Sequence, residues 1–466
     1  MTTGKLFRSL RGFPGYPHML TLTDASDQIR TRKLSPVELT RECLARIDRL
    51  NPTLNAFITV TADLALEQAR RAEEEITKGN YRGPLHGIPF ALKDNIDTAG
   101  VRTTAGSNQF RERVPTEDTK IVRRLKLAGA AIVGKTNMHE FAFGGSGVVS
   151  AFGSVRNPCD PERITGGSSS GSAAAVASGM CIAAIGTDTA GSVRCPAALC
   201  GIVGHRPSQG VLSNEGIIPL AESFDTPGPM TLTVADALTI LQSLAPVGCP
   251  SLFASEQTEL SRLRVGHARN LASDLDREVA LRFEAAVQAI RTMVSSVCDV
   301  DVKADVPWDL RNFEIHRYHK RMMEASPGLY QPATLERLRA VAGVSETDYV
   351  HRSERFKAEL QANPLFAEVD LVLSPTVPVA APLVAELEIM STSALREFEL
   401  KYLLRNTVPF SFLWWPSVSV PCGFTSAGLP IGLQISGRPG ADLQVLQLAL
   451  AYESATEWHS RAPQLN

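Results

Sequence analysis

The sequence lacks the features that would assign it to a specialised class of protein. Its 466 residues carry 47 Lys and Arg against 49 Asp and Glu, so no excess of positive charge favours binding to nucleic acid or to an anionic membrane. No apolar run is long enough to span a bilayer, and residues 1–20 lack the apolar stretch of a signal peptide. The eight cysteines include no C-x-x-C pair, and we expect reduced thiols. These absences predict a cytoplasmic protein that binds neither nucleic acid nor membranes.

What the chain does contain is the pattern of an α/β protein. Hydrophobic residues make up 44% of it, which is ordinary for a packed core. Short apolar runs between turn residues predict strands, and the amphipathic stretches between them predict helices around a central sheet. We expect one domain over residues 1–466, in which the charged and aromatic residues 305–366 form a helical subregion. Strands are expected at residues 130–133, 181–185, 263–265, 371–373, 418–420 and 431–435, and helices after a capping box at residues 35–38 and over residues 64–76.

Three short segments make chemical sense only together. They are residues 87–94 (GIPFALKD), 166–172 (GGSSSGS) and 186–192 (GTDTAGS). They supply Lys93 at the end of an apolar run, a cluster of serines bounded by glycines, and Ser192 after a second glycine turn. Serine is a weak nucleophile that needs a base, and a lysine drawn into a dry site becomes neutral and can accept a proton. The combination indicates a serine hydrolase whose base is lysine rather than histidine.

Each segment has a simpler interpretation when it is taken alone. A single lysine usually lies at the surface, and Gly-Ser pairs are common in loops. The serine cluster precedes a run of alanines and so leads into a helix, but it lacks the lysine of a phosphate-binding loop. A turn over residues 186–191 would direct several main-chain N–H groups at one point, as a developing oxyanion requires. His139-Glu140 resembles a metal pair, but no second histidine follows at i+4, so we expect it to support the site by packing or hydrogen bonds.

Taken in this order, the three segments resemble the amidase signature family of serine hydrolases. Residues 134–141 (GKTNMHEF), 223–228 (SFDTPG) and 428–434 (GLPIGLQ) are similar to the same family, so the resemblance covers most of the chain. It implies an α/β fold with a central mixed β-sheet surrounded by helices. It also implies chemistry without a metal ion or an organic cofactor.

The resemblance implies a role for each residue that matches the family pattern. Ser192 would be the nucleophile that forms an acyl-enzyme, Ser168 the bridging serine and Lys93 the base. In the family the bridging serine follows a cis peptide, which here would join Gly167 to Ser168. The oxyanion hole would be formed by the main-chain N–H groups of Thr189, Ala190 and Gly191, extending to Ser192.

The resemblance also places Ala142 in the acyl pocket, and two positions depart from the family pattern. Ala190 stands where the family often has glycine, which is harmless only if its φ angle is negative. The pair His205-Arg206 stands where Leu-Lys is common, which leaves the packing beyond the nucleophile open. Neither departure falls on the three residues expected to carry the chemistry.

Three functions remain compatible with the sequence. The leading one is an amidase that cleaves the C–N bond of a linear, small-molecule carboxamide to an acid and ammonia or an amine. The second is the glutamine-hydrolysing subunit of a tRNA-dependent amidotransferase, which would pass ammonia to a partner chain. The third is a catalytically silent relative that only binds a ligand. The sequence leaves open which amide is the substrate and whether the chain forms a homodimer.

Overall fold

The computed structural model describes residues 19–246, 248, 249, 252, 259–303, 306–341, 345–361 and 364–458. Residues 1–18, which belong to the N-terminal segment examined above for a signal peptide, lie outside the described residues. Asp305, the first residue of the expected helical subregion, also lies outside them. In the described part of the chain, eleven strands form one sheet in the order β1-β3-β2-β6-β8-β7-β12-β13-β11-β9-β10. Their bounds are β1 Phe57–Val60, β2 Pro89–Lys93, β3 Ala131–Thr136, β6 Ala183–Asp188, β7 Val203–Arg206, β8 Thr226–Thr231, β9 Arg264–Ala268, β10 Ser296–Val300, β11 Leu371–Pro375, β12 Ser417–Phe424 and β13 Pro430–Gly437.

The sheet is mixed, and helices surround it. Strand β2 runs parallel to β3 and β6, and β9 runs parallel to β10 and β11, whereas the other neighbours are antiparallel. A separate hairpin pairs β4 (Arg156–Asn157) with β5 (Asp160–Ile164). The helices are α1 Leu22–Arg30, α2 Pro36–Leu54, α3 Ala62–Thr77, α4 Lys120–Leu127, α5 Ser170–Ala177, α6 Arg194–Cys200, α7 Val234–Leu244, α8 Arg277–Arg291, α9 Trp308–Ala325, α10 Pro332–Ala340, α11 Glu346–Gln361, α12 Leu365–Glu368, α13 Val384–Glu388, α14 Thr392–Phe398, α15 Val408–Phe412 and α16 Asp442–Ser454. The predicted α/β class with a central mixed sheet is therefore confirmed.

Most of the predicted elements are present with bounds shifted by a few residues. Helix α2 begins at the predicted cap, where the Ser35 hydroxyl accepts the N–H groups of Val37 and Glu38 at 3.1 and 3.2 Å. The prediction of a turn over residues 186–191 is wrong in its first half. Residues 186–188 instead extend β6, because β8 lies beside them and pairs with each of them in antiparallel register.

Strand β8 was not predicted, and its sequence explains why. It contains Pro227 and Pro229, and proline normally excludes a segment from the middle of a sheet because it donates no ladder hydrogen bond. The sequence indicates β2 only as an apolar run that ends at Lys93. Every residue of both strands is buried, so they lie in the interior of the molecule between layers of helices.

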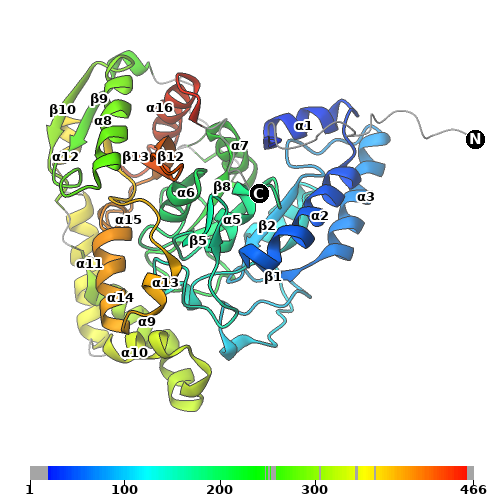
Figure 1. Cartoon of the computed structure of the whole chain (residues 1–466), viewed down its shortest axis with the longest axis horizontal. Coiled ribbons are helices and arrows are strands. Elements are labelled where there is room, and N and C mark those ends of the chain that lie inside the picture. The colour runs from blue at the N-terminus through cyan, green and yellow to red at the C-terminus, as the bar shows by residue number, and fades with distance from the viewer. Residues whose placement is uncertain are drawn as a thin grey trace, which may run out of the picture.

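Helices α9 to α11 and α14 form a layer on one side of the molecule, away from α1 to α3 (Figure 1). The expected helical subregion over residues 305–366 contains α9, α10, α11 and the start of α12. One apolar cluster joins this layer to the loops that follow β3 and β6, with Leu310 and Leu338 from the layer and Phe141 and Ala190 from the loops. The layer thereby covers the loops at the carboxyl ends of β3 and β6.

Two further observations bear on the expectations from composition. Seven of the cysteines are free thiols, and of these Cys43, Cys181, Cys195, Cys200 and Cys422 are buried, whereas Cys159 and Cys298 are partly or fully exposed. Among the described helices, none combines the length and the apolar character that crossing a membrane would demand.

Candidate active site

Lys93 lies at the carboxyl end of β2, where the parallel strand β6 also ends. Its side chain is completely buried. The Nζ group donates to the Ser168 hydroxyl at 2.7 Å, to the Thr187 hydroxyl at 2.7 Å and to the Thr187 carbonyl at 3.3 Å. All three sequence segments are therefore in direct contact, because Thr187 on β6 belongs to the third segment, although the sequence did not suggest this residue as a partner of Lys93.

The buried position of Lys93 changes its protonation. Burial lowers the pKa of Lys93 to about 7, and the carboxylates of Asp225 and Asp188 only partly oppose this shift. At neutral pH a large fraction of the amine is consequently unprotonated. A neutral amine beside a serine hydroxyl is able to accept its proton.

Ser168 lies in the loop that leads into α5, and the peptide bond between Gly167 and Ser168 is cis, as the resemblance implies. The main-chain N–H of Ser169 donates to the carbonyl of Ser192 at 3.1 Å, which holds the two serine segments together. Within the described residues, the hydroxyls of Ser168 and Ser192 are not hydrogen-bonded to each other.

Ser192 opens onto a cavity of about 640 Å³ that is also lined by Ala142, Thr189 and Ala190. Its residue is 4% exposed, so access is through this cavity. Ala142 is buried and has a positive φ of 59°, unusual for a residue other than glycine. The cavity therefore contains both the expected nucleophile and the residue expected in the acyl pocket.

The turn before Ser192 depends on Gly191. This glycine has a φ of 134°, and a Cβ atom on it would lie 2.0 Å from the Thr407 hydroxyl. Its N–H, which was expected in the oxyanion hole, donates to the Asp188 carboxylate at 2.8 Å in this structure. For the N–H groups of Thr189, Ala190 and Ser192, the described residues provide no acceptor. Ala190 does not adopt a positive φ, so its departure from glycine introduces no strain.

Comparison with known proteins agrees with this geometry. The family model described as Amidase matches residues 38–306 and 327–446. The chain belongs to the amidase signature family. Among its relatives, a glutamyl-tRNA(Gln) amidotransferase subunit from Chloroflexus aurantiacus is 35% identical, over 96% of this chain and 99% of the relative. The corresponding subunit from Thermosynechococcus vestitus is 34% identical over 96% of this chain and all of the relative.

Solved structures of amidases share the fold. A structure described as an amidase is 32% identical with a TM-score of 0.82, over 93% of this chain and 99% of the other. The peptide amidase of Stenotrophomonas maltophilia is 30% identical with a TM-score of 0.81, over 96% and 98% of the two chains. Family and fold together make this chain an amide hydrolase.

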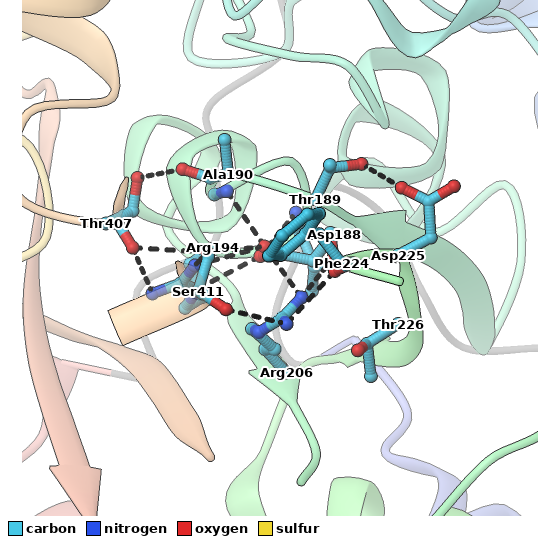
Figure 2. Close-up of polar contacts among 12 residues, drawn as sticks. Asp188, Thr189, Ala190, Arg194, Arg206, Phe224, Asp225, Thr226, Thr407 and Ser411 are labelled. Carbon is cyan, nitrogen blue, oxygen red and sulfur yellow. Dashed lines mark hydrogen bonds and ion pairs between the residues drawn. The ribbon is translucent and has the colours of Figure 1, made fainter. Parts of the chain in front are cut away.

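In this amidase, a buried ion network around Asp188 adjoins the turn that precedes Ser192 (Figure 2). The two carboxylate oxygens of Asp188 accept hydrogen bonds from the Arg194 guanidinium, each at 3.0 Å. The same carboxylate also accepts the main-chain N–H groups of Gly191 and Val193. Arg206 donates to the carbonyls of Asp188, Phe224 and Ser411. Asp188, Arg194 and Arg206 are all inaccessible to solvent, so the network fixes the turn rigidly.

The acidic and basic groups of this network keep one another charged despite their burial. Burial alone would raise the pKa of Asp188, but Arg194 and Arg206 outweigh burial and hold it below its usual range. Burial lowers the pKa of Arg206 to about 10, which leaves its guanidinium charged at neutral pH. The departure from the family pattern at Arg206 thus supplies a cation with several donors where a lysine would have a single ammonium group.

Asp225 orients the residue at the start of the expected oxyanion hole. Its carboxylate accepts the Thr189 hydroxyl at 2.5 Å and the N–H groups of Leu220 and Ala221 at 2.8 and 3.2 Å (Figure 2 shows the Thr189 contact). Burial raises the pKa of Asp225 to about 6 despite these hydrogen bonds. Asp225 belongs to the quoted family segment 223–228, but no local pattern in the sequence pointed to its function.

The pair considered above as a metal site is divided between different partners. His139 lies 3.8 Å from Glu399, and burial lowers its pKa to about 4, so it is neutral. Glu140 accepts the Ser107 hydroxyl at 2.5 Å and the N–H of Gln331 at 2.9 Å. Across the described residues, no group of three or more potential ligands is placed to hold a metal ion.

Proposed function

We propose that this enzyme hydrolyses a linear, small-molecule carboxamide through an acyl-enzyme on Ser192. The observation that carries the proposal is the 2.7 Å contact between the buried amine of Lys93 and the Ser168 hydroxyl, with Ser192 on the wall of the adjoining cavity. An unprotonated amine in this position is able to act as the general base that a serine nucleophile requires.

The steps of the reaction follow from these positions. The Ser192 hydroxyl attacks the amide carbon and loses its proton to Ser168, which passes its own proton to Lys93. The relay returns a proton to the leaving nitrogen as the C–N bond breaks. Water then attacks the ester, with the same relay as base, and releases the acid and Ser192. The sum is one amide and one water converted to one acid and one amine or ammonia.

The oxyanion of each tetrahedral intermediate is assigned to main-chain donors of the turn. Thr189 and Ala190 have N–H groups with no acceptor among the described residues, which supports this role. The N–H of Gly191 is engaged by Asp188 and would contribute only if that bond were released. Fixed donors of this kind stabilise developing charge without reorganisation. Ala142 is assigned to the wall around the acyl group.

A serine-reactive fluorophosphonate and an ammonia-release assay test this proposal together. Wild-type enzyme should be labelled and should release ammonia, and Ser192→Ala should do neither while it melts at an unchanged temperature. Ser261→Ala is a matched control, because this serine is exposed and, among the described residues, its hydroxyl donates only to the Glu259 carboxylate. Near-normal turnover by Ser192→Ala would refute the assignment. Absence of label and turnover in the wild type would favour the silent binding module.

The names of the relatives favour one further candidate, the glutaminase subunit of a tRNA-dependent amidotransferase. Two of these relatives, at 34–35% identity, are named as subunits of a glutamyl-tRNA(Gln) amidotransferase. If this chain has that function, it should co-purify with a partner and hydrolyse glutamine only with that partner. Efficient hydrolysis of simple amides by the isolated chain would count against it. The free cysteines are consistent with a cytoplasmic location, which we include in the proposal.

A further inference from the structure

The cavity in front of Ser192 has an unusual excess of positive charge. Its walls include four arginines and, among the described lining residues, one carboxylate, that of Glu399. The arginines are Arg311 on α9, Arg337 on α10, Arg396 on α14, and Arg405. A small-molecule site usually contains few charged groups, and those it contains determine which ligands bind.

Two of the four arginines have their charge compensated by the protein. Arg337 pairs with Glu399 at 2.8 Å and donates to the carbonyl of Phe143 at 2.7 Å. Arg405 lies 4.0 Å from Asp274 and donates to the carbonyl of Ser273 at 2.7 Å. These contacts explain both side chains as supports of the cavity wall.

Of the other two, Arg396 is only partly buried, whereas Arg311 is buried without a carboxylate. Its residue is 8% exposed, and no acidic group of the described chain lies within ion-pair distance of it. Within the described part of the chain, its guanidinium donates one hydrogen bond, from Nη1 to the side-chain oxygen of Asn312 at 3.2 Å, and its Nε has no partner. The guanidinium carbon lies 5.0 Å from the ring centroid of Phe143 and 5.4 Å from that of Trp308. The two rings hold the group in place and leave donors free.

The neighbours of Arg311 do not remove its charge. Burial lowers the pKa of Arg311 to about 9, with Arg396 and Arg337 lowering it and Asp225 raising it, so the group stays protonated at neutral pH. Aromatic faces stabilise a desolvated cation only in part. A buried cation without a counter-ion is costly and is typical of a site that a ligand completes.

We propose that Arg311 binds a carboxylate of the substrate, so that the enzyme acts on amides that also carry an acid group, such as the monoamides of dicarboxylic acids. This inference rests on the proposed function of Ser192, because the amide is presented to Ser192 in the same cavity that Arg311 lines. The planar guanidinium, with its two flanking rings, suits paired hydrogen bonds to a carboxylate.

Paired substrates of equal chain length test the inference. Succinamate, glutaramate and adipamate are compared with butanamide, pentanamide and hexanamide by ammonia release. Wild-type enzyme should show a higher kcat/KM for the acidic member of at least one pair. Arg311→Met should lower that value about 10- to 100-fold, mostly through KM, and leave the neutral amides nearly unchanged. Arg311→Lys should restore part of the loss.

Arg317→Met is the matched control. Arg317 lies on the same helix and also lies over aromatic rings, those of Phe313 and Tyr349, but it is exposed and does not line the cavity. Its replacement should leave both substrate series unchanged. A wild-type preference for the neutral amides, or an equal loss on both series in Arg311→Met, would overturn the inference.

A binding measurement separates this inference from the proposed function. Glutarate is titrated calorimetrically into wild-type and Arg311→Met enzyme, which needs no turnover. Binding that Arg311→Met weakens at least tenfold supports the carboxylate site, even if no amide is hydrolysed and no fluorophosphonate label appears. Equal binding by both proteins, or no binding at millimolar glutarate, contradicts it, even if neutral amides are hydrolysed and Ser192 is labelled.

Discussion

Replacing Lys93 tests the proposed chemistry most directly, because the pKa of this residue determines how much base is present. At pH 7, a lysine with the lowered pKa of about 7 is about half neutral. With the ordinary pKa of 10.5, about one molecule in 3,000 would be neutral, since the two values differ by 3.5 units. Burial therefore increases the available base about a thousandfold. We expect Lys93→Ala to lower turnover by about 10² to 10⁴.

The pH dependence of kcat/KM shows whether the neutral or the protonated form of Lys93 is needed. If Lys93 is the base as proposed, its neutral amine is the active form, and kcat/KM of the wild type should rise about tenfold per pH unit below pH 7 and level off above it. Lys93→Arg should not restore activity, because a guanidinium stays protonated. The assay is ammonia release between pH 5 and 9, with circular dichroism to verify that each variant is folded.

Lys135→Met is the control for the loss of a buried lysine near the site. Lys135 is also inaccessible to solvent, but its Nζ donates to the Ile96 carbonyl and the Thr103 hydroxyl at 2.7 and 2.6 Å and not to a serine. Its replacement should reduce stability and leave the rise in activity near pH 7 in place. The reasoning is refuted if Lys93→Ala remains active while the variant of a single histidine is as inactive as Ser192→Ala.

The network behind the turn and the turn itself give two further predictions. Asp188→Asn should lower the free energy of unfolding by about 3–5 kcal/mol in urea, because it leaves Arg194 and Arg206 buried without a counter-ion. Asp97→Asn, which breaks a partly exposed pair with Arg113, should cost about 1 kcal/mol or less, and equal losses for the two variants would contradict the argument. Gly191→Ala should reduce kcat about 100-fold, because its Cβ would displace Thr407 and the turn. Gly210 also has a positive φ, but no atom lies within 4 Å of the position that a Cβ would take, so Gly210→Ala should leave kcat unchanged. A similar loss of kcat in Gly210→Ala would assign the effect at Gly191 to backbone strain alone.

The sequence itself determined the family, the α/β class and the residues on which the chemistry is proposed to depend. Lys93, Ser168 and Ser192 were identifiable because they lie in three short segments whose residue types and order are specific to one kind of chemistry. The cap of α2 at Ser35 was also predictable, since a capping interaction spans only a few consecutive residues.

Other features required contacts between segments that lie far apart in the chain. Strand β8 contains prolines, and its place in the interior of the sheet depends on pairing with β6 and β7. The lowered pKa of Lys93 depends on burial at the ends of two parallel strands, which no local pattern encodes.

The same limit applies to the charges around the site. Arg206 and Asp188 are 18 positions apart, and Arg311 meets the Ser192 cavity only because α9 packs over the loops that follow β3 and β6. Local sequence determines which groups are able to react. It also determines where turns lie and where helices begin. Burial and charge compensation arise from the whole fold, and they decide the protonation of Lys93 and the free charge of Arg311.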